Sequence, residues 1–244
     1  MRVEYVFLDN GGVITDNSRR GAQYRRLVGQ FFVPRFGGTQ EAWEAANAVA
    51  FPGVWPRFLQ RVEHWDAARD IAREMSLYYV DWLRSMFAAM GVEPPASDEA
   101  CGALGQEVDY WINPQIDARF LGVEEAIEAL ARDYRLYTAS DGFSLPLAVA
   151  IGESARHFER LYGPDLINVP KSSGRPYYDA VFEHAGVDAA RALVVDDNLP
   201  NIIAAQSAGA HTVFVTSQPS AHEGRTIARL AELPGIIETL WMPL

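Results

Sequence analysis

The chain begins with a short apolar run that ends in an acidic residue and a glycine-rich turn. The run covers residues 3–8 and is followed by Asp9, Asn10, Gly11 and Gly12. A run of this length, bounded by turn-forming residues, predicts a buried β-strand. Because an ionised carboxylate is costly to bury, an aspartate at the end of a core strand favours contact with a ligand or a metal ion.

From about residue 19 to residue 112 the apolar positions recur at a helical spacing. In the longest segment they lie three or four residues apart, at Ile71, Met75, Tyr78, Trp82, Met86 and Ala89. This pattern predicts one apolar helix face, and Gly91 predicts the end of the helix. Pro94 and Pro95 cannot continue a helix, and Ser97 predicts the N-cap of the next one. Helices are therefore expected near residues 19–34, 40–50, 55–63 and 97–112, besides the longest one.

After residue 114 the pattern changes to helices that alternate with short apolar runs. Strands are expected at residues 135–139, 166–169, 192–195 and 212–215, and helices near 123–132, 145–161, 177–185 and 200–208. Short apolar strands separated by helices predict a parallel sheet that is covered on both faces. The strand before Asp9 belongs to the same sheet, so the helical region is an insertion. We expect an α/β fold, a doubly wound parallel sheet built from residues 1–16 and 117–244, with an all-helical domain over residues 17–116.

The composition is that of an ordinary globular protein of 244 residues. Its formal net charge of -11 argues against a nucleic-acid backbone or an anionic membrane surface as the main partner. No segment reaches the roughly 18 uninterrupted apolar residues of a membrane-spanning helix. Cys101 is the only cysteine, which excludes an intramolecular disulfide and fits a reducing compartment. No signal peptide precedes the first strand, so we expect a cytoplasmic protein.

Polar residues follow three of the predicted strands, at the edge of the sheet where ligands bind in this class of fold. Asp9 follows the first strand, Ser140 and Asp141 follow the second, and Asp196 and Asp197 follow a later one. A single aspartate at a strand end is commonly a local cap of the loop. Three such strand ends can converge on one crevice, and repelling carboxylates are tolerated together mainly when a hard cation joins them. The sequence therefore predicts a metal site at this edge.

With these features the sequence resembles the haloacid dehalogenase (HAD) superfamily of phosphohydrolases. Four motifs occur in the order of that family, namely residues 7–14 (FLDNGGVI), residues 136–140 (LYTAS), Lys171 and residues 194–197 (VVDD). Each motif is weak by itself, whereas the ordered set is specific. The helical region between the first two motifs resembles the helical cap of the family. The resemblance thus covers essentially the whole chain and implies a Rossmann-like core.

The resemblance implies a magnesium-dependent phosphatase that acts on a small phosphorylated metabolite. Asp9 would be the nucleophile and would form an aspartyl-phosphate that water then hydrolyses. Mg²⁺ would be held by Asp9, the backbone carbonyl of Gly11 and Asp196, with Asp197 as a direct or indirect ligand. The hydroxyl of Ser140 would hold a phosphoryl oxygen. The residues expected to contact the substrate are Asn10, Gly11, Ser140, Asp141 and Lys171.

The cation of the third motif has two candidates. Lys171 would neutralise charge on the phosphoryl group and the nucleophile, but Arg175 is followed by Pro176, as the lysine of the family often is. In the family pattern an aromatic residue and then a glycine follow the lysine at set distances. Tyr178 and Gly186 satisfy these distances from Lys171 with one extra residue, which favours Lys171. A compact ammonium also suits a point-charge role better than a planar guanidinium does. The competing interpretation is that either residue is a solvated surface cation.

Position 11 departs from the family pattern, in which a second aspartate protonates the leaving oxygen and later activates water. General acid–base help is typically worth roughly 10²- to 10⁴-fold in rate. Asn10 does not replace this aspartate, because an adjacent residue points the opposite way and an amide does not titrate. Asp16 and Asp141 are candidates for a substitute acid, and loop capping is the competing interpretation for both.

Two alternative functions follow from the same residues. A 2-haloacid dehalogenase would use the same nucleophile without a metal, but that branch usually has an aromatic residue at position 11, and paired aspartates suit a metal better. The other alternative is a catalytically weakened member that binds a ligand or a protein partner. The identity of the substrate and the oligomeric state stay open at this point.

Overall fold

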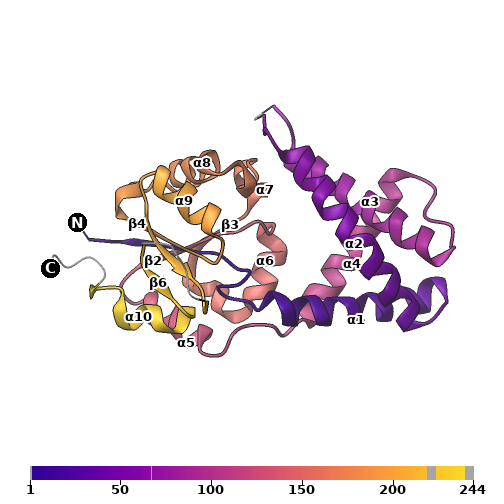
Figure 1. Cartoon of the computed structure of the whole chain (residues 1–244), viewed down its shortest axis with the longest axis horizontal. Helices are drawn as coiled ribbons and strands as arrows, with labels where there is room; N and C mark the ends of the chain where they lie inside the picture. Colours follow the sequence, from indigo (N-terminus) through magenta and orange to yellow (C-terminus); the bar gives the residue numbers. More distant parts are fainter. Residues whose placement is uncertain (1, 67, 219–223, 240–244) are drawn as a thin grey trace. The chain divides into compact units, whose positions relative to one another are not determined.

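The core of the protein is a parallel β-sheet with the strand order β3-β2-β1-β4-β5-β6. The computed structural model describes residues 2–66, 68–218 and 224–239 (Figure 1). The strands are β1 (Tyr5–Leu8), β2 (Arg135–Ala139), β3 (Phe158–Tyr162), β4 (Ala192–Asp196), β5 (His211–Val215) and β6 (Thr226–Ile227). Because β1 lies between β2 and β4, the carboxyl ends of these three strands are neighbours.

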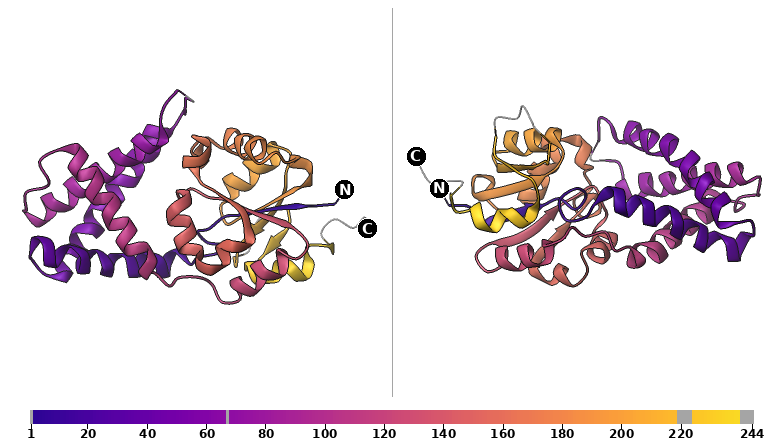
Figure 2. Two further views of the ribbon diagram at one scale, coloured as in Figure 1. Left: turned by 180° about the vertical axis from the view of Figure 1, so that it is seen from behind. Right: turned by 60° about the horizontal axis from the view of Figure 1, so that its bottom comes forward.

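Helices cover both faces of the sheet, as Figures 1 and 2 show for α8 and α9 on one side and α5 and α10 on the other. Val6 and Leu8 of β1 pack into one apolar cluster with α5, and Phe7 packs into another with α8. This alternation follows from the two-residue repeat of a strand. The helices of this unit are α5 (Val123–Leu130), α6 (Ser144–Ile151), α7 (Pro164–Ile167), α8 (Arg175–Ala185), α9 (Leu199–Ser207) and α10 (Leu233–Ile236). The predicted doubly wound α/β fold is confirmed.

One strand of the sheet was predicted in the wrong place. The structure has a helix and a loop at residues 166–169, and the strand lies at Phe158–Tyr162, where it overlaps the end of the range 145–161 predicted as helix. β3 is an edge strand in which Glu159 and Arg160 are exposed, so its sequence has the charge content of a helix surface. Asn168 adopts a left-handed conformation (φ 52°), which is incompatible with a strand at that point.

The second unit is entirely helical in its described residues. It contains α1 (Asn17–Phe36), α2 (Gln40–Val62), α3 (Ile71–Met90) and α4 (Asp98–Ile112). Contacts divide the chain into one unit of residues 1–17 and 118–244 and another of residues 18–117. The predicted caps of two helices are confirmed, since Gly91 ends α3 with φ 64° and the Ser97 hydroxyl accepts a hydrogen bond from the Ala100 amide.

The predicted break between residues 50 and 55 is wrong, because α2 continues through Pro52 and Pro56. Proline inside a helix removes a backbone hydrogen bond and is unfavourable. The apolar face is nevertheless uninterrupted, with buried residues at every fourth position, namely Ala50, Val54, Phe58 and Val62. Burial of this face against α3 stabilises the continuous helix.

Aromatic packing accounts for the most deeply buried tryptophans of the helical unit. Trp43 stacks on Phe32 with ring centroids 4.7 Å apart, and Phe87 meets both rings edge-on. The Trp82 indole donates a hydrogen bond of 2.8 Å to Asn47 Oδ1. Across the described ranges, no helix combines the length and the apolar character that a bilayer crossing requires.

Candidate active site

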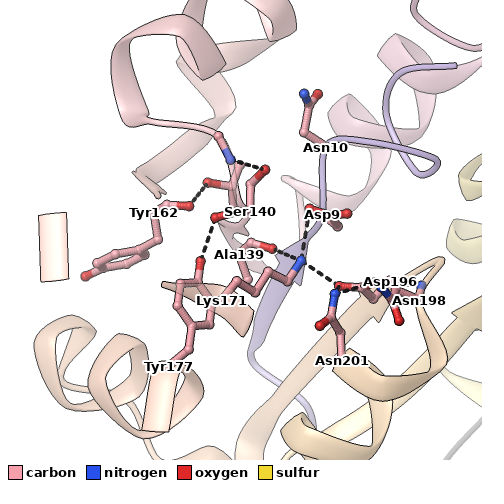
Figure 3. Close-up of polar contacts among 12 residues, drawn as sticks. Asp9, Asn10, Ala139, Ser140, Tyr162, Lys171, Tyr177, Asp196, Asn198 and Asn201 are labelled. Atoms are coloured by element: carbon pink, nitrogen blue, oxygen red, sulfur yellow. Dashed lines mark hydrogen bonds and ion pairs between the residues drawn. The ribbon is translucent and has the colours of Figure 1, made fainter. Parts of the chain in front are cut away.

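The carboxyl ends of β1, β2 and β4 bring together the polar residues that follow them. Asp9 comes directly after β1, and its backbone amide donates to the Val195 carbonyl of β4 at 2.9 Å. Ser140 follows β2, and Asp196 is the last residue of β4. Asp9, Ser140 and Asp196 are 8%, 4% and 0% exposed. Figure 3 shows their side chains around a common centre.

Lys171 lies at this centre and contacts all three strand ends. Its Nζ is 3.0 Å from Asp9 Oδ1 and 2.7 Å from Asp196 Oδ2, and it donates to the Ala139 carbonyl at 2.7 Å. The side chain is 1% exposed. Burial by itself would lower the pKa of Lys171, but the carboxylates of Asp9 and Asp196 raise it well above its ordinary value. Lys171 is therefore a permanent cation of the site.

Arg175 does not take part in this cluster. It lies at the first position of α8, where its Nε is 3.1 Å from Asp179 Oδ2, and both side chains are at least half exposed. Of the two cations that the sequence left open, the structure places Lys171 against Asp9. Arg175 corresponds to the solvated surface cation of the competing interpretation.

Asp9 is held in an environment that disfavours its charge. The pKa of Asp9 is raised to about 7, chiefly by burial; Lys171 opposes this rise, and the nearby carboxylates of Asp196 and Asp141 contribute to it. A carboxylate in such a place stays ionised most readily when more positive charge is nearby. The environment of Asp9 thus favours a second cation beside Lys171.

Asp196 and Asp197 differ in how many contacts their carboxylate oxygens already make within the protein. Asp196 Oδ1 accepts from the Asn198 backbone amide at 2.8 Å, Asn201 Nδ2 lies 3.2 and 3.3 Å from its two oxygens, and Oδ2 contacts Lys171. Asp197 is more exposed. Carboxylate oxygens of Asp9, Asp196 and Asp197 lie within 4.8 Å of one another. Such a set of oxygen donors fits Mg²⁺, and Asp197 has more free capacity than Asp196.

The turn after Asp9 is shaped by its glycines. The Asn10 carbonyl accepts hydrogen bonds from the amides of Ile14 (2.9 Å) and Thr15 (2.8 Å), whereas the Gly11 carbonyl accepts no backbone hydrogen bond from the residues that the structure describes. Gly12 has φ 77°, and a Cβ atom there would be 1.8 Å from Asp197 Oδ2. Only glycine allows the Asp197 carboxylate to approach this turn so closely.

The loop after β2 holds Ser140 from several sides. Its amide donates to the Tyr162 carbonyl at 3.2 Å, and the Tyr177 hydroxyl donates to the Ser140 carbonyl at 3.1 Å. The hydroxyl oxygen accepts from the Gly142 amide at 3.2 Å. Ser140, rather than Asp141, therefore provides the local hydrogen bond of this loop. Asp141 is exposed and lies close enough to interact electrostatically with Asp9 and Lys171.

Asn10 lies apart from the carboxylate cluster. Its side chain points away from Lys171 in Figure 3, and its Oδ1 is buried with no hydrogen-bond partner among the described residues. A ligand group or a water molecule that donates a hydrogen bond would satisfy this oxygen.

Sequence reasoning missed two side chains that support the site, Tyr177 and Asn201. Asn201 lies in the first turn of α9, five residues after Asp196. This short spacing could have indicated that its amide contacts the Asp196 carboxylate. Tyr177 lies in α8 and reaches Ser140 across a large sequence separation. No local pattern marks such a contact.

A parallel α/β core with an inserted helical unit and a buried lysine among strand-end aspartates defines a class of hydrolases. The chain belongs to the haloacid dehalogenase-like hydrolases, whose family model matches residues 3–209. The family resemblance is thereby confirmed. A search of curated proteins gives no significant match.

Solved structures with the same fold include proteins of low sequence identity. YfnB from Bacillus subtilis, solved with bound magnesium, has a TM-score of 0.66 and 19% identity over 99% of this chain and 100% of its own. The 2-haloacid dehalogenase from Pseudomonas syringae pv. Tomato DC3000 has a TM-score of 0.67 and 16% identity over 97% and 99%. L-2-haloacid dehalogenase from Xanthobacter autotrophicus, with chloropropionic acid covalently bound, has a TM-score of 0.61 and 15% identity over 97% and 98%. At such low sequence identities, the similarity to these structures shows a shared fold only.

Proposed function

We propose that this HAD-like hydrolase is a magnesium-dependent phosphatase that forms an aspartyl-phosphate at Asp9. The observation that carries the proposal is the cluster of Asp9, Asp196 and Asp197, whose oxygens lie within 4.8 Å of one another beside the buried cation Lys171. Three carboxylates at one point suit a divalent cation. A cation also allows an anionic nucleophile to approach an anionic phosphoryl group.

The proposed metal ligands are Asp9, Asp197 and the Gly11 carbonyl, with Asp196 as a further ligand. Asp197 is the stronger candidate of the acidic pair, because Asp196 already accepts hydrogen bonds from Asn198 and Asn201 and contacts Lys171. The chemistry supplied by Mg²⁺ in such a site is neutralisation of charge on the transferred phosphoryl group. We propose that Asp196 mainly holds Lys171 in place.

In the proposed reaction, a carboxylate oxygen of Asp9 forms a bond to phosphorus as the bond to the leaving oxygen breaks. Lys171 neutralises negative charge beside the nucleophile, and Ser140 donates its hydroxyl proton in a hydrogen bond to a phosphoryl oxygen. Asn10 and Asp141 lie on the adjoining loops, where they would contact the rest of the substrate. Water then hydrolyses the aspartyl-phosphate and regenerates Asp9.

The substrate proposed is a small phosphorylated metabolite in the cytoplasm, and a panel assay tests this reaction class. Phosphorylated metabolites, an activated aryl phosphate and 2-haloacids are each incubated with the protein, with and without Mg²⁺. We expect phosphate release that depends on Mg²⁺ and no halide release. Halide release without Mg²⁺ would contradict the proposal and identify a dehalogenase, the function of several proteins that share this fold. Binding of a phosphorylated metabolite without its hydrolysis would identify the alternative function, a catalytically weakened family member that binds a ligand.

The proposed metal site predicts that Mg²⁺ affinity falls as the pH is lowered. Because Asp9 must be ionised to bind the cation and burial raises its pKa to about 7, protons compete with Mg²⁺ below that pH. For one competing proton, we expect affinity to fall by up to about tenfold per pH unit below about 7 and to level off above it. Calorimetric titration at several pH values between about 5.5 and 8.5 measures this dependence. Equal affinity across that range would contradict the raised pKa of Asp9 in the metal-free site.

A further inference from the structure

The side chain of Asn17 fills the space that a side chain at position 11 would occupy. An ideal Cβ atom built on Gly11 would lie 2.8 Å from Asn17 Oδ1 and 3.0 Å from Asn17 Nδ2. Asn17 is the first residue of α1, and it is exposed to solvent. The carboxamide therefore lies over the turn two residues from Asp9, where a bound molecule can reach it.

The two glycines of this turn each make room for a polar group from another segment. Gly12 admits the carboxylate of Asp197, and Gly11 admits the carboxamide of Asn17. The first of these groups belongs to the proposed metal site. The carboxamide of Asn17 carries no charge and lies on the same turn. It is therefore placed to contact an uncharged or leaving part of the substrate and not the metal ion.

The turn itself contains no group that can release a proton. The residues from Asn10 to Thr15 are asparagine, glycine, valine, isoleucine and threonine, none of which titrates in the working range of an enzyme. An amide can donate a hydrogen bond to a developing negative charge without transferring a proton.

We propose, on the basis of the proposed phosphatase function, that Asn17 contacts the leaving-group oxygen and restricts the enzyme to phosphates with acidic leaving groups. Acyl, enol and aryl phosphates form this substrate class. As Asp9 bonds to phosphorus, the electron pair of the broken bond stays on the leaving oxygen, which departs as a carboxylate, enolate or phenolate. The amide of Asn17 donates a hydrogen bond to that anion. Both protons of the hydrolytic water leave with the phosphate product.

The test is a series of aryl phosphates of graded leaving-group acidity, together with one alkyl phosphate, assayed for kcat/KM with Mg²⁺. For the unaltered protein we expect a steep fall in rate as the leaving group becomes less acidic. Asn17→Ala should lower kcat/KM for the aryl phosphates by about 10- to 100-fold, the contribution expected for a hydrogen bond to a charged group. Asn17→Asp should weaken the dependence of kcat/KM on leaving-group acidity and raise turnover of the alkyl phosphate. Its pH–rate profile should also gain an acidic limb.

Gln30→Ala is the matched control, because it removes an exposed carboxamide from the same helix. It should leave kcat/KM for every phosphate ester unchanged. The proposal is overturned if Asn17→Ala matches the unaltered protein, or if alkyl and aryl esters turn over equally well. In the second case another acid protonates the leaving group, and whichever of Asp16→Asn and Asp141→Asn restores a steep dependence identifies it. If no ester is hydrolysed while haloacids are, the phosphatase function itself fails and this proposal falls with it.

Discussion

Replacing Asp9 by asparagine is expected to lower Mg²⁺-dependent phosphate release by about 10⁴-fold or more, the scale seen when a covalent nucleophile is removed. Asparagine has nearly the same shape as aspartate, but its amide cannot attack phosphorus to give a stable intermediate. The fold should persist, because burial disfavours the charge of Asp9 and the substitution removes that charge. Lys171 keeps its contact with Asp196.

The measurement is phosphate release from an activated aryl phosphate, combined with circular dichroism to verify the fold. Asp133→Asn is the matched control, since it makes the same chemical change at an exposed position and should retain full activity. Trapping of phosphate on the unaltered protein, and its absence from Asp9→Asn, would identify the intermediate. Activity of Asp9→Asn close to that of the unaltered protein would contradict the nucleophile assignment.

The sequence predicts the core of this fold well because its strands have a distinct local pattern. Buried strands such as β2 and β4 are short, mostly apolar segments between turns, so they could be located without the structure. The edge strand β3 could not, because one side of it meets solvent and its composition includes exposed charges. The continuity of α2 through Pro52 and Pro56 likewise depends on packing against α3, which local propensity does not reveal.

The candidate site was predictable to the extent that its residues follow strand ends. The order of neighbouring strands brings Asp9, Ser140 and Asp196 together, and the motif order had already pointed to these three positions. Asn17 and Tyr177 could not be found in this way. Asn17 lies beside Gly11, and Tyr177 reaches Ser140 from α8; neither placement follows a strand end or a local sequence pattern.

The choice between Lys171 and Arg175 also required the structure. Both cations precede the same helical segment, and only four positions separate them in the sequence. A short 3-10 helix at Lys171–Ser173 buries the lysine beneath the strand ends, whereas Arg175 starts α8 at the surface. A substitution at each position therefore separates the two interpretations.

Replacing Lys171 by methionine is expected to lower the free energy of unfolding by about 3–5 kcal/mol at about pH 8 without Mg²⁺, the range for breaking a buried ion pair. The variant leaves Asp9 and Asp196 facing each other without a cation. Since Lys171 opposes the rise in the pKa of Asp9, its loss should raise that pKa further. The folded variant then binds a proton that the unfolded chain releases, so its stability should fall as the pH rises from about 5 to 8.

Urea denaturation at about pH 5, 6.5 and 8 measures this effect, and Arg175→Met is the control. Because Arg175 forms an exposed pair with Asp179, its loss should change stability by no more than about 0.5 kcal/mol. Adding Mg²⁺ should recover part of the stability of Lys171→Met, since a cation between the carboxylates replaces some of the lost positive charge, but phosphate release should stay at least about 100-fold lower. Equal stability of the two variants at about pH 8 would show that the buried ion pairs do not hold this site together, and loss of activity in Arg175→Met alone would assign the catalytic cation to Arg175.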